Sequence, residues 1–556
     1  MSLQPQTIPE IPEQTARIAR AAFRKGNLVM QMRDAFGTFF HDEQFQELFP
    51  KRGQPAEAPW RLALVTIFQF LEDQSDRQAA DAVRSRLDWK YALSLELEDP
   101  GFDFSVLSQF RQRLIEGKAE EKLLNVLLSA FKERGFLKAG GRQRTDSTHI
   151  LAAVRTLNRL EKVGQTMAAA LESLAIVAPH WLVSVTPVEW FARYGRRVEN
   201  FRLPRSEKDR EAWAVQVGQD GFFLLAVIDT ATAQEVFFLK DVPAIATLRQ
   251  VLAEQYDTSS PGPPRFKGSK ELPAAAEQLA SPYDTDARFA TKREISWVGY
   301  KVHLTETCDS DTPHLVVHVE TTAATVPDEN MLEVLHPKLA EKGMLPGEHL
   351  VDMGYTDAGI LAGSLKDYGV DVVGPVAKNP SWQSREGGFD KDQFQVDWET
   401  QTVTCPAGKQ AIRWYDYREG RIKVDTNKHG WIHIQFSRKD CTACEHRSDC
   451  TRAKSEFRQL MLPSREEYEA LRAARLRQGT ESFAQTYRLR AGVEATHGQA
   501  NRRCGLRQCR YLGTAKTHLQ HIATAAAVNL VCVWDWLSER SPAPTRITRF
   551  AKLAPA

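Results

Sequence analysis

The spacing of apolar positions divides the chain into a helical first part and a second part in which strands and helices alternate. Residues 59–71 form a nearly continuous apolar run that opens with proline, a residue that helices favour at their first position. Ser75 and Gln78 have capping-box spacing and open a second predicted helix over residues 77–91, and a third is predicted over residues 106–114. These segments predict short, packed helices within residues 1–140.

Beyond residue 140, short apolar runs bounded by glycine, proline and acidic residues predict strands. Residues 222–228 fit a helix or a strand, because so short a run has no distinguishing period. The alternation as a whole predicts an α/β fold. The predicted order is a strand that ends in Asp146, helices inserted at about 150–280, strands at 295–306 and 314–321, a helix at 328–342, a strand at 349–353, a helix at 357–368 and a strand at 370–376.

One segment is strongly basic in a chain whose charges otherwise nearly balance, with 73 basic and 71 acidic residues and a formal net charge of +2. Between residues 487 and 516 a single acid, Glu494, stands among seven basic side chains. These are Arg488, Arg490, Arg502, Arg503, Arg507, Arg510 and Lys516. Such a segment is suited to a phosphate backbone. The alternative is a basic surface helix with an incidental glutamate.

The basic segment predicts a helix over residues 487–500, which lack proline, with Tyr487, Arg490, Glu494 and Asn501 on one face. On this interpretation Glu494 is a metal-binding carboxylate held against a polyanion.

One glutamate cannot hold a divalent ion in a phosphoryl-transfer site, so partner acids are needed. Asp146 ends a strand-like run, and Asp352 lies in a short apolar strand closed by a glycine. An acid in a buried strand is costly unless it binds a metal or a cationic partner. The alternative for either aspartate is a turn or a helix cap.

With these residues the chain resembles insertion-sequence DDE transposases that have a ribonuclease-H-like core and a Tyr-(2)-Arg-(3)-Glu-(6)-Lys signature. Tyr487, Arg490 and Glu494 match the first three positions in type and spacing. Asn501, followed by two arginines, stands at the lysine position. Segments within residues 281–304 resemble the stretch that precedes and forms the second core strand.

The resemblance implies an α/β protein with a ribonuclease-H-like mixed-sheet core, a helical N-terminal domain, a helical insertion and a small β-rich cysteine insertion similar to a zinc ribbon. A helical packing or dimerisation role is the alternative for the N-terminal domain. The implied division is a DNA-binding domain at 1–140, the first part of the core at 141–380 with the helical insertion at about 150–280, the cysteine insertion at 381–484, core helices carrying Glu494 at 485–540 and a tail at 541–556.

The resemblance also implies a DNA transposase that binds the ends of its mobile element and catalyses metal-dependent strand cleavage and strand transfer. Its expected partners are double-stranded DNA, both terminal inverted repeats and target, and a second copy of the chain. The implied site residues are Asp146, Asp352 and Glu494 for two Mg²⁺ or Mn²⁺ ions, and Tyr487, Arg490, Arg502, Arg503, Arg507, Arg111 and Arg113 for DNA. The alternatives are a ribonuclease-H-like nuclease without strand transfer and an inactive DNA-binding repressor.

Four of the eight cysteines, Cys405, Cys441, Cys444 and Cys450, lie within 46 residues. Two thiolates separated by two residues can face one tetrahedral ion, and a second pair completes a structural zinc site. The spacing therefore predicts zinc in a β-rich module, with disulfides, an iron–sulfur cluster and unliganded thiols as alternatives. The others, Cys308, Cys504, Cys509 and Cys532, have no partner spacing and are expected to be ordinary.

The composition, 42% hydrophobic and 26% charged, is typical of a globular protein. The most apolar segment, residues 522–537, is too short and too polar to span a bilayer and predicts a core helix. No export signal is apparent, so we expect a bacterial cytoplasmic protein that is associated with the nucleoid when bound to DNA.

Overall fold

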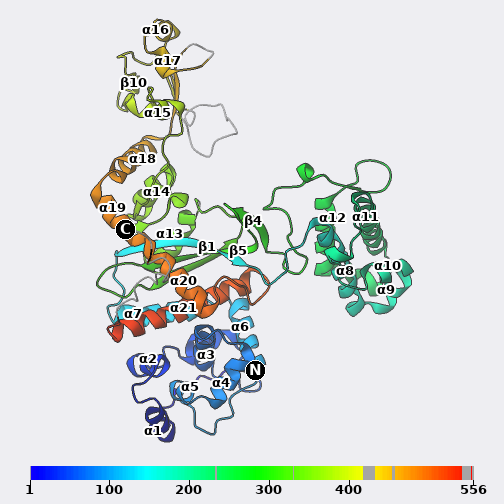
Figure 1. Cartoon of the computed structure of the whole chain (residues 1–556). Helices are drawn as coiled ribbons and strands as arrows, with labels where there is room; N and C mark the ends of the chain where they lie inside the picture. Colours follow the sequence, from blue (N-terminus) through cyan, green and yellow to red (C-terminus); the bar gives the residue numbers. More distant parts are fainter. Residues whose placement is uncertain are drawn as a thin grey trace.

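The computed structural model describes residues 2–231, 234–329, 331–416, 432–453, 457–540 and 553. A central sheet carries helices beneath it, a helical lobe on one side and a cysteine-bearing module on an arm (Figure 1). The tail predicted at 541–556 lies outside the described residues, except for Leu553.

The first 140 residues are helical, as predicted. Proline opens the third α-helix, and Ser75 and Gln78 form the capping box of the fourth. That helix ends at Ser85, short of the predicted residue 91, because Arg86 has an extended backbone and its guanidinium pairs with Glu72 and Asp88. The elements are α1 (Glu13–Ala22), α2 (Leu28–Phe36), η1 (Asp42–Leu48), α3 (Pro59–Leu71), α4 (Asp76–Ser85), α5 (Leu87–Ala92), α6 (Ser105–Glu116) and α7 (Lys122–Glu133).

The sheet is mixed, and its strands stand in the order β6, β5, β1, β7, β8, with β4 pairing the first part of β5. β5 runs antiparallel to β1 and β6, whereas β1, β7 and β8 are parallel. The predicted antiparallel pair is confirmed. The strands are β1 (Arg142–Leu151), β4 (Arg288–Lys292), β5 (Ile295–Thr307), β6 (Val316–Ala323), β7 (Glu348–Leu350) and β8 (Asp371–Val373).

Both aspartate-bearing strands differ from the prediction. Asp146 lies in the middle of β1, because antiparallel pairing with β5 continues as far as Leu151. Asp352 lies just beyond β7, where its carboxylate accepts a 2.8 Å hydrogen bond from the Gly354 N–H and caps η5 (Met353–Tyr355). Both acids therefore lie just beyond the last paired residues of β1 and β7, where β7 ends and β1 continues.

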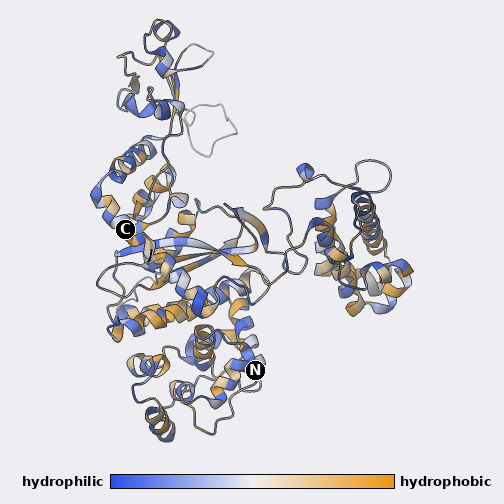
Figure 2. Cartoon of the chain, in the orientation of Figure 1, coloured by the Kyte–Doolittle hydropathy of each residue, from blue (hydrophilic) through white to orange (hydrophobic). Residues whose placement is uncertain are grey.

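α21 (Thr514–Leu537) is the predicted core helix and joins the sheet to the N-terminal helices. It packs against β6 on one side and α3 on the other (Figure 2). The Asn529 amide accepts a 2.7 Å bond from the Val316 N–H and donates a 2.8 Å bond to the Val316 carbonyl. The N-terminal helices and the sheet consequently share one hydrophobic core. No helix in the described part of the chain is long and apolar enough to cross a membrane.

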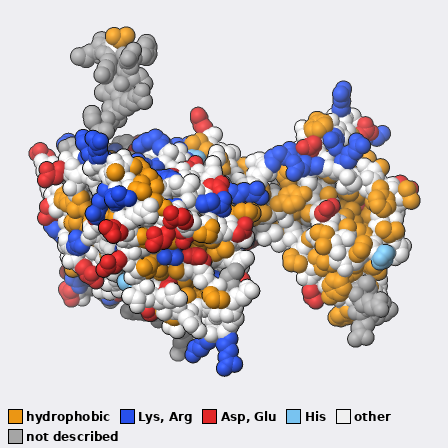
Figure 3. Space-filling view, turned by 90° about the horizontal axis from the view of Figure 1, so that it is seen from below, with side chains coloured by type: hydrophobic (Ala, Val, Ile, Leu, Met, Phe, Trp, Pro, Cys, Tyr) orange, Lys and Arg blue, Asp and Glu red, His pale blue; other side chains and the backbone are white. Residues whose placement is uncertain are grey.

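A separate helical lobe follows β1 and has its own core. Residues 222–228, which fitted either structure, are helical, with Leu224, Leu225 and Ile228 buried inside the lobe. Its helices are α8 (Arg159–Val177), α9 (Pro179–Val185), α10 (Val188–Tyr194), α11 (Glu207–Thr230) and α12 (Pro243–Gln255). Apolar side chains cover much of the visible face of this lobe (Figure 3). The exposed apolar residues of the lobe include Val183, Val188, Phe191 and Phe201.

Residues 382–462 hold the cysteine module, which has a small hydrophobic core of its own around Phe394, Phe436 and Leu462. β11, β12 and β13 form an antiparallel sheet, and β9 pairs with β10. The helices α13 (Met331–Glu341) and α14 (Ala358–Tyr368) precede the module. Its elements are α15 (Trp382–Glu386), β9 (Gln395–Asp397), β10 (Thr402–Thr404), β11 (Arg413–Asp416), β12 (Ile432–Gln435), α16 (Arg438–Thr442), α17 (Arg447–Cys450) and β13 (Gln459–Leu462), with α18 (Arg465–Gln478) leading back to the sheet.

Candidate active site

The three predicted acids come together from three distant segments. β1 and β7 are parallel neighbours in which Arg144 pairs with Leu350. Asp146 and Asp352 each lie two residues beyond that pair, so they lie side by side at the carboxyl end of β7. Glu494 lies in the first turn of α20 (Gly492–Cys504). We call these three residues the three-acid cluster.

One guanidinium contacts all three acids. Arg490 places Nη2 2.7 Å from Asp146 Oδ2 and 3.7 Å from Asp352 Oδ2, and Nη1 3.2 Å from Glu494 Oε1. The Arg490 side chain is 14% exposed, and its Nε is buried without a hydrogen-bond partner among the described residues. The cluster is therefore built around a cation.

Both aspartates are oriented by backbone N–H groups. Ser147 N–H donates to Asp146 Oδ1 and Gly354 N–H donates to Asp352 Oδ1, each at 2.8 Å. In each aspartate the other oxygen, Oδ2, faces Arg490. The chain thus uses one oxygen of each carboxylate to fix its direction and presents the second to the centre of the cluster.

Burial raises the pKa of Asp146 to about 6, opposed by the charge of Arg490 and reinforced by that of Asp352. Burial alone would lower the pKa of Arg490, but the neighbouring Asp146, Tyr487 and Asp352 raise it overall. The cluster sets three acids against one guanidinium, so its acidic groups outnumber its cation. Such a site attracts further cations.

The donor set fits a hard divalent ion, because Mg²⁺ and Mn²⁺ prefer carboxylate oxygens. The guanidinium shows that a cation can reach all three acids at once. No group of three or more His, Cys, Asp or Glu side chains in the described ranges is arranged to hold a metal ion as it stands. The acids are thus spaced for the guanidinium, and an ion would have to draw them closer.

The prediction of one continuous helix over residues 487–500 is wrong. α19 (Glu481–Tyr487) ends first, η7 (Arg488–Ala491) follows as a 3-10 turn, and α20 then begins. The guanidinium of Arg144 lies at this break. Its Nη1 donates a hydrogen bond to the Leu489 carbonyl, and the group occupies the space into which a side chain on residue 492 would project, so Gly492 makes room for it. The turn places Arg490 at the cluster. Tyr487 instead stacks on Phe483, with ring centroids 5.5 Å apart.

Sequence reasoning missed a buried network behind the cluster. Arg144 Nε donates to Glu306 Oε1 and Thr496 Oγ1 donates to Glu306 Oε2, both at 2.6 Å. Arg144 and Glu306 side chains are only 5% and 1% exposed. Burial raises the pKa of Glu306, and the charge of Arg144 opposes that shift. The network links β1, β5 and α20, so it fixes the helix of Glu494 against the strand of Asp146.

A fourth acid, Asp328, was also missed. It contacts Lys301 at 3.0 Å and Lys292 at 3.3 Å, and accepts a 3.1 Å hydrogen bond from the hydroxyl of Ser147. Two lysines already balance this carboxylate, so it adds a fixed ion pair beside the cluster. Lys292 is largely exposed and brings a positive charge to the rim of the site.

The basic residues after Glu494 lie on the surface. Arg502, Arg503 and Arg507 are exposed. The side-chain carbonyl of Asn501 accepts a 3.3 Å hydrogen bond from the Arg507 N–H, so it holds the turn that follows α20. Arg510, by contrast, is mostly covered, and its guanidinium pairs with the exposed carboxylate of Asp73.

The expectation that Arg111 is available to DNA is wrong. It is 6% exposed, its Nη2 lies 2.6 Å from Asp76 Oδ2, and its guanidinium lies over the ring of Tyr511. Arg113 donates to the Leu48 carbonyl at 3.1 Å. The basic positions of α6 therefore stabilise the helical region from within.

Two protein-family models match parts of the chain. Residues 404–534 match a family described as Transposase DDE domain. Residues 18–113 match a family described as Transposase domain (DUF772). These matches support an insertion-sequence transposase. The first match includes Glu494, Arg490 and the four clustered cysteines, whereas Asp146 and Asp352 lie outside both. No curated protein matches the chain.

Proposed function

We propose that this chain is a DNA transposase that binds the ends of its mobile element and cleaves and joins DNA strands at the three-acid cluster. The observation that carries the proposal is the meeting of three acids from β1, the end of β7 and α20 around one guanidinium. The order β6, β5, β1, β7, β8 with an antiparallel β5 supports a ribonuclease-H-like core. The two transposase family matches support the reaction class.

In this proposal Asp146, Asp352 and Glu494 hold two Mg²⁺ or Mn²⁺ ions. Metal bound there supplies Lewis-acid stabilisation of the charge that develops on the phosphate during strand cleavage and joining. The backbone N–H groups of Ser147 and Gly354 keep the aspartate oxygens directed at the centre. Because Glu494 is 67% exposed, it is the acid that can move most readily toward an ion.

Arg490 is proposed to offset part of the negative charge of the cluster before DNA and metal arrive and then to contact a DNA phosphate beside it. Its guanidinium and a divalent ion compete for the same oxygens. Arg490→Met should therefore bind Mn²⁺ about tenfold more tightly without DNA, a gain of about 1.4 kcal/mol. Titration calorimetry of the DNA-free protein measures this affinity.

The control for Arg490 is Arg488→Met, which removes an exposed arginine from the same turn. Its Mn²⁺ affinity should stay at the wild-type value. Equal affinities in the two variants would mean that Arg490 does not compete with metal.

The exposed arginines after Glu494 are proposed to follow the DNA backbone. Replacing Arg502 and Arg503 together with alanine should weaken binding to any DNA sequence and make its salt dependence shallower by about two units of slope, one for each lost phosphate contact. Fluorescence anisotropy over a salt series measures the slope.

A matched control is the double alanine replacement of Arg196 and Arg197, an exposed pair in the helical lobe with the same charge change. Its slope should equal that of the wild type. An unchanged slope in the Arg502–Arg503 variant would assign those side chains to solubility alone.

The function itself is tested by incubating the purified chain with Mg²⁺ and DNA that carries the ends of its own encoding element. Joined products support strand transfer. Nicked DNA without joining would favour the ribonuclease-H-like nuclease, and binding without any nick would favour the repressor. A Glu494→Gln sample serves as the control for contaminating nucleases.

A further inference from the structure

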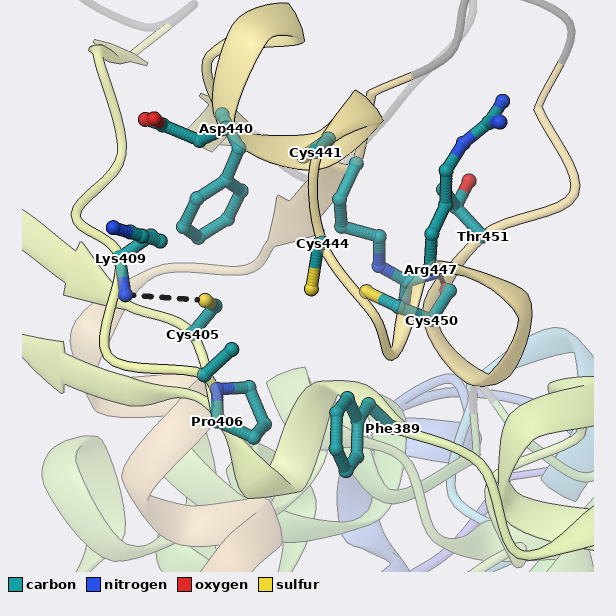
Figure 4. A pocket seen from close by; sticks show the side chains of 13 residues that line it. Phe389, Cys405, Pro406, Lys409, Asp440, Cys441, Cys444, Arg447, Cys450 and Thr451 are labelled. Carbon is teal, nitrogen blue, oxygen red and sulfur yellow. Dashed lines mark hydrogen bonds between the residues drawn. The ribbon is translucent and has the colours of Figure 1, made fainter.

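The four clustered cysteines surround one small cavity in the cysteine module. The cavity has a volume of about 30 Å³, the size of a single water or ion, and is lined by Cys405, Cys441, Cys444 and Cys450. The sulfurs of Cys405, Cys444 and Cys450 face a common space (Figure 4). All eight cysteines of the chain are free, so no disulfide uses these sulfurs.

The cysteines reach the cavity from separate elements. Cys405 follows β10, Cys441 lies in α16, Cys444 lies two residues beyond that helix, and Cys450 ends α17. The apolar part of the wall is completed by Phe389, Pro406, Ala407 and Phe436. An ion held there would therefore join the β9–β10 pair to both short helices.

Several N–H groups around the cavity lack an ordinary acceptor. The Lys409 N–H donates to Cys405 Sγ at 3.3 Å. The Nε atoms of Arg447 and Arg458, two residues that also line the cavity, are buried without a hydrogen-bond partner among the described residues. Buried donors are rarely left unpaired, and the cysteine sulfurs in the same lining are able to accept hydrogen bonds.

We propose that Cys405, Cys441, Cys444 and Cys450 bind one Zn²⁺ as thiolates and that Arg458, which also donates to the Cys450 carbonyl, donates an N–H group to a sulfur. Four thiolates around Zn²⁺ carry a net charge of about −2, part of which the Arg458 guanidinium offsets. Binding releases the thiol protons to water. Because the described side chains are not yet arranged around an ion, binding draws the sulfurs inward. Four protein ligands leave no open position, so the zinc is structural.

Elemental analysis of the native full-length chain, purified without added metal, tests the site. About one zinc per chain is expected. Cys444→Ser should lose the metal, whereas Cys532→Ser, which alters a cysteine outside the module, should keep it. A metal-free native protein, or iron with visible absorbance, would overturn the proposal.

Replacing the bound metal of the native protein with Co²⁺ tests the four-cysteine site even if Cys444→Ser does not fold. Native protein exchanged with Co²⁺ should show the absorption bands of a tetrahedral tetrathiolate site. Bands of an octahedral oxygen-ligated ion, or no incorporation, would overturn the proposal. These outcomes do not depend on DNA cleavage, so they are distinguishable from failure of the transposase proposal.

The role of Arg458 is tested by zinc affinity. Arg458→Gln should weaken zinc binding at least about tenfold in competition with a chelator, because groups that hydrogen-bond metal ligands change metal affinity by that amount. Lys439→Gln, an exposed charge change in the same module, should leave the affinity unchanged. An affinity equal to that of this control would overturn the role given to Arg458.

Discussion

Asp146→Asn, Asp352→Asn and Glu494→Gln are each expected to lower DNA cleavage by at least about a thousandfold, equivalent to about 4 kcal/mol of transition-state stabilisation. An amide has nearly the shape of the acid it replaces but lacks the negative charge that holds a divalent ion. Each variant should still fold and bind DNA, because the basic surface after Glu494 remains. Cleavage of end-labelled element DNA with Mg²⁺ measures the loss.

Asp357→Asn is the matched control for the aspartates. Asp357 lies five residues after Asp352 and caps α14 through a 2.8 Å bond from the Ile360 N–H. Asparagine caps helices about as well as aspartate, so this variant should cleave at the wild-type rate. Full cleavage activity in a variant of any of the three acids would exclude that acid from the site.

The sequence predicted correctly those helices and strands that depend on residues close to one another in the chain. The proline at the start of α3 and the capping box of α4 depend on neighbours within a few residues, and both are present as predicted. The antiparallel β5–β6 pair followed from two apolar runs close in the chain. The break before α20 could not be predicted, because its cause is Arg144, which lies far away in the sequence.

The same limit applies to the site. Residue types and spacing marked Asp146, Asp352 and Glu494 as candidates, but their meeting depends on the register of β1 with β7. The sequence predicted that Arg490 contacts a DNA phosphate, and only the folded structure shows that its guanidinium lies between the acids. Arg111 was misassigned because its partners, Asp76 of α4 and Tyr511 in the segment before α21, lie far from it in the sequence.

The second large effect is expected from the buried pair of Arg144 and Glu306. Glu306→Gln should destabilise the core by about 3–5 kcal/mol, because it leaves the Arg144 guanidinium buried without its counter-charge. The midpoint of denaturant unfolding, followed by tryptophan fluorescence, measures the loss.

Glu348→Gln is the matched control for this pair. Glu348 pairs with Arg142, two residues before Arg144 on the same strand, but those side chains are 37% and 46% exposed. An exposed pair contributes at most about 1 kcal/mol, so the midpoint should barely move. Equal shifts in the two variants would mean that burial does not set the strength of the inner pair.

The double replacement Arg144→Met with Glu306→Leu separates stability from positioning. Removing both charges should recover most of the lost stability, because apolar groups can replace a buried ion pair. The rate of DNA cleavage should nevertheless be well below that of the wild type, because the double variant also loses the hydrogen bonds from Arg144 to the Leu489 carbonyl and from Thr496 to Glu306. Those bonds hold the turn of Arg490 and the helix of Glu494 against β1. If both stability and cleavage recovered, the Arg144–Glu306 network would contribute only to stability and would not be needed to align the three acids.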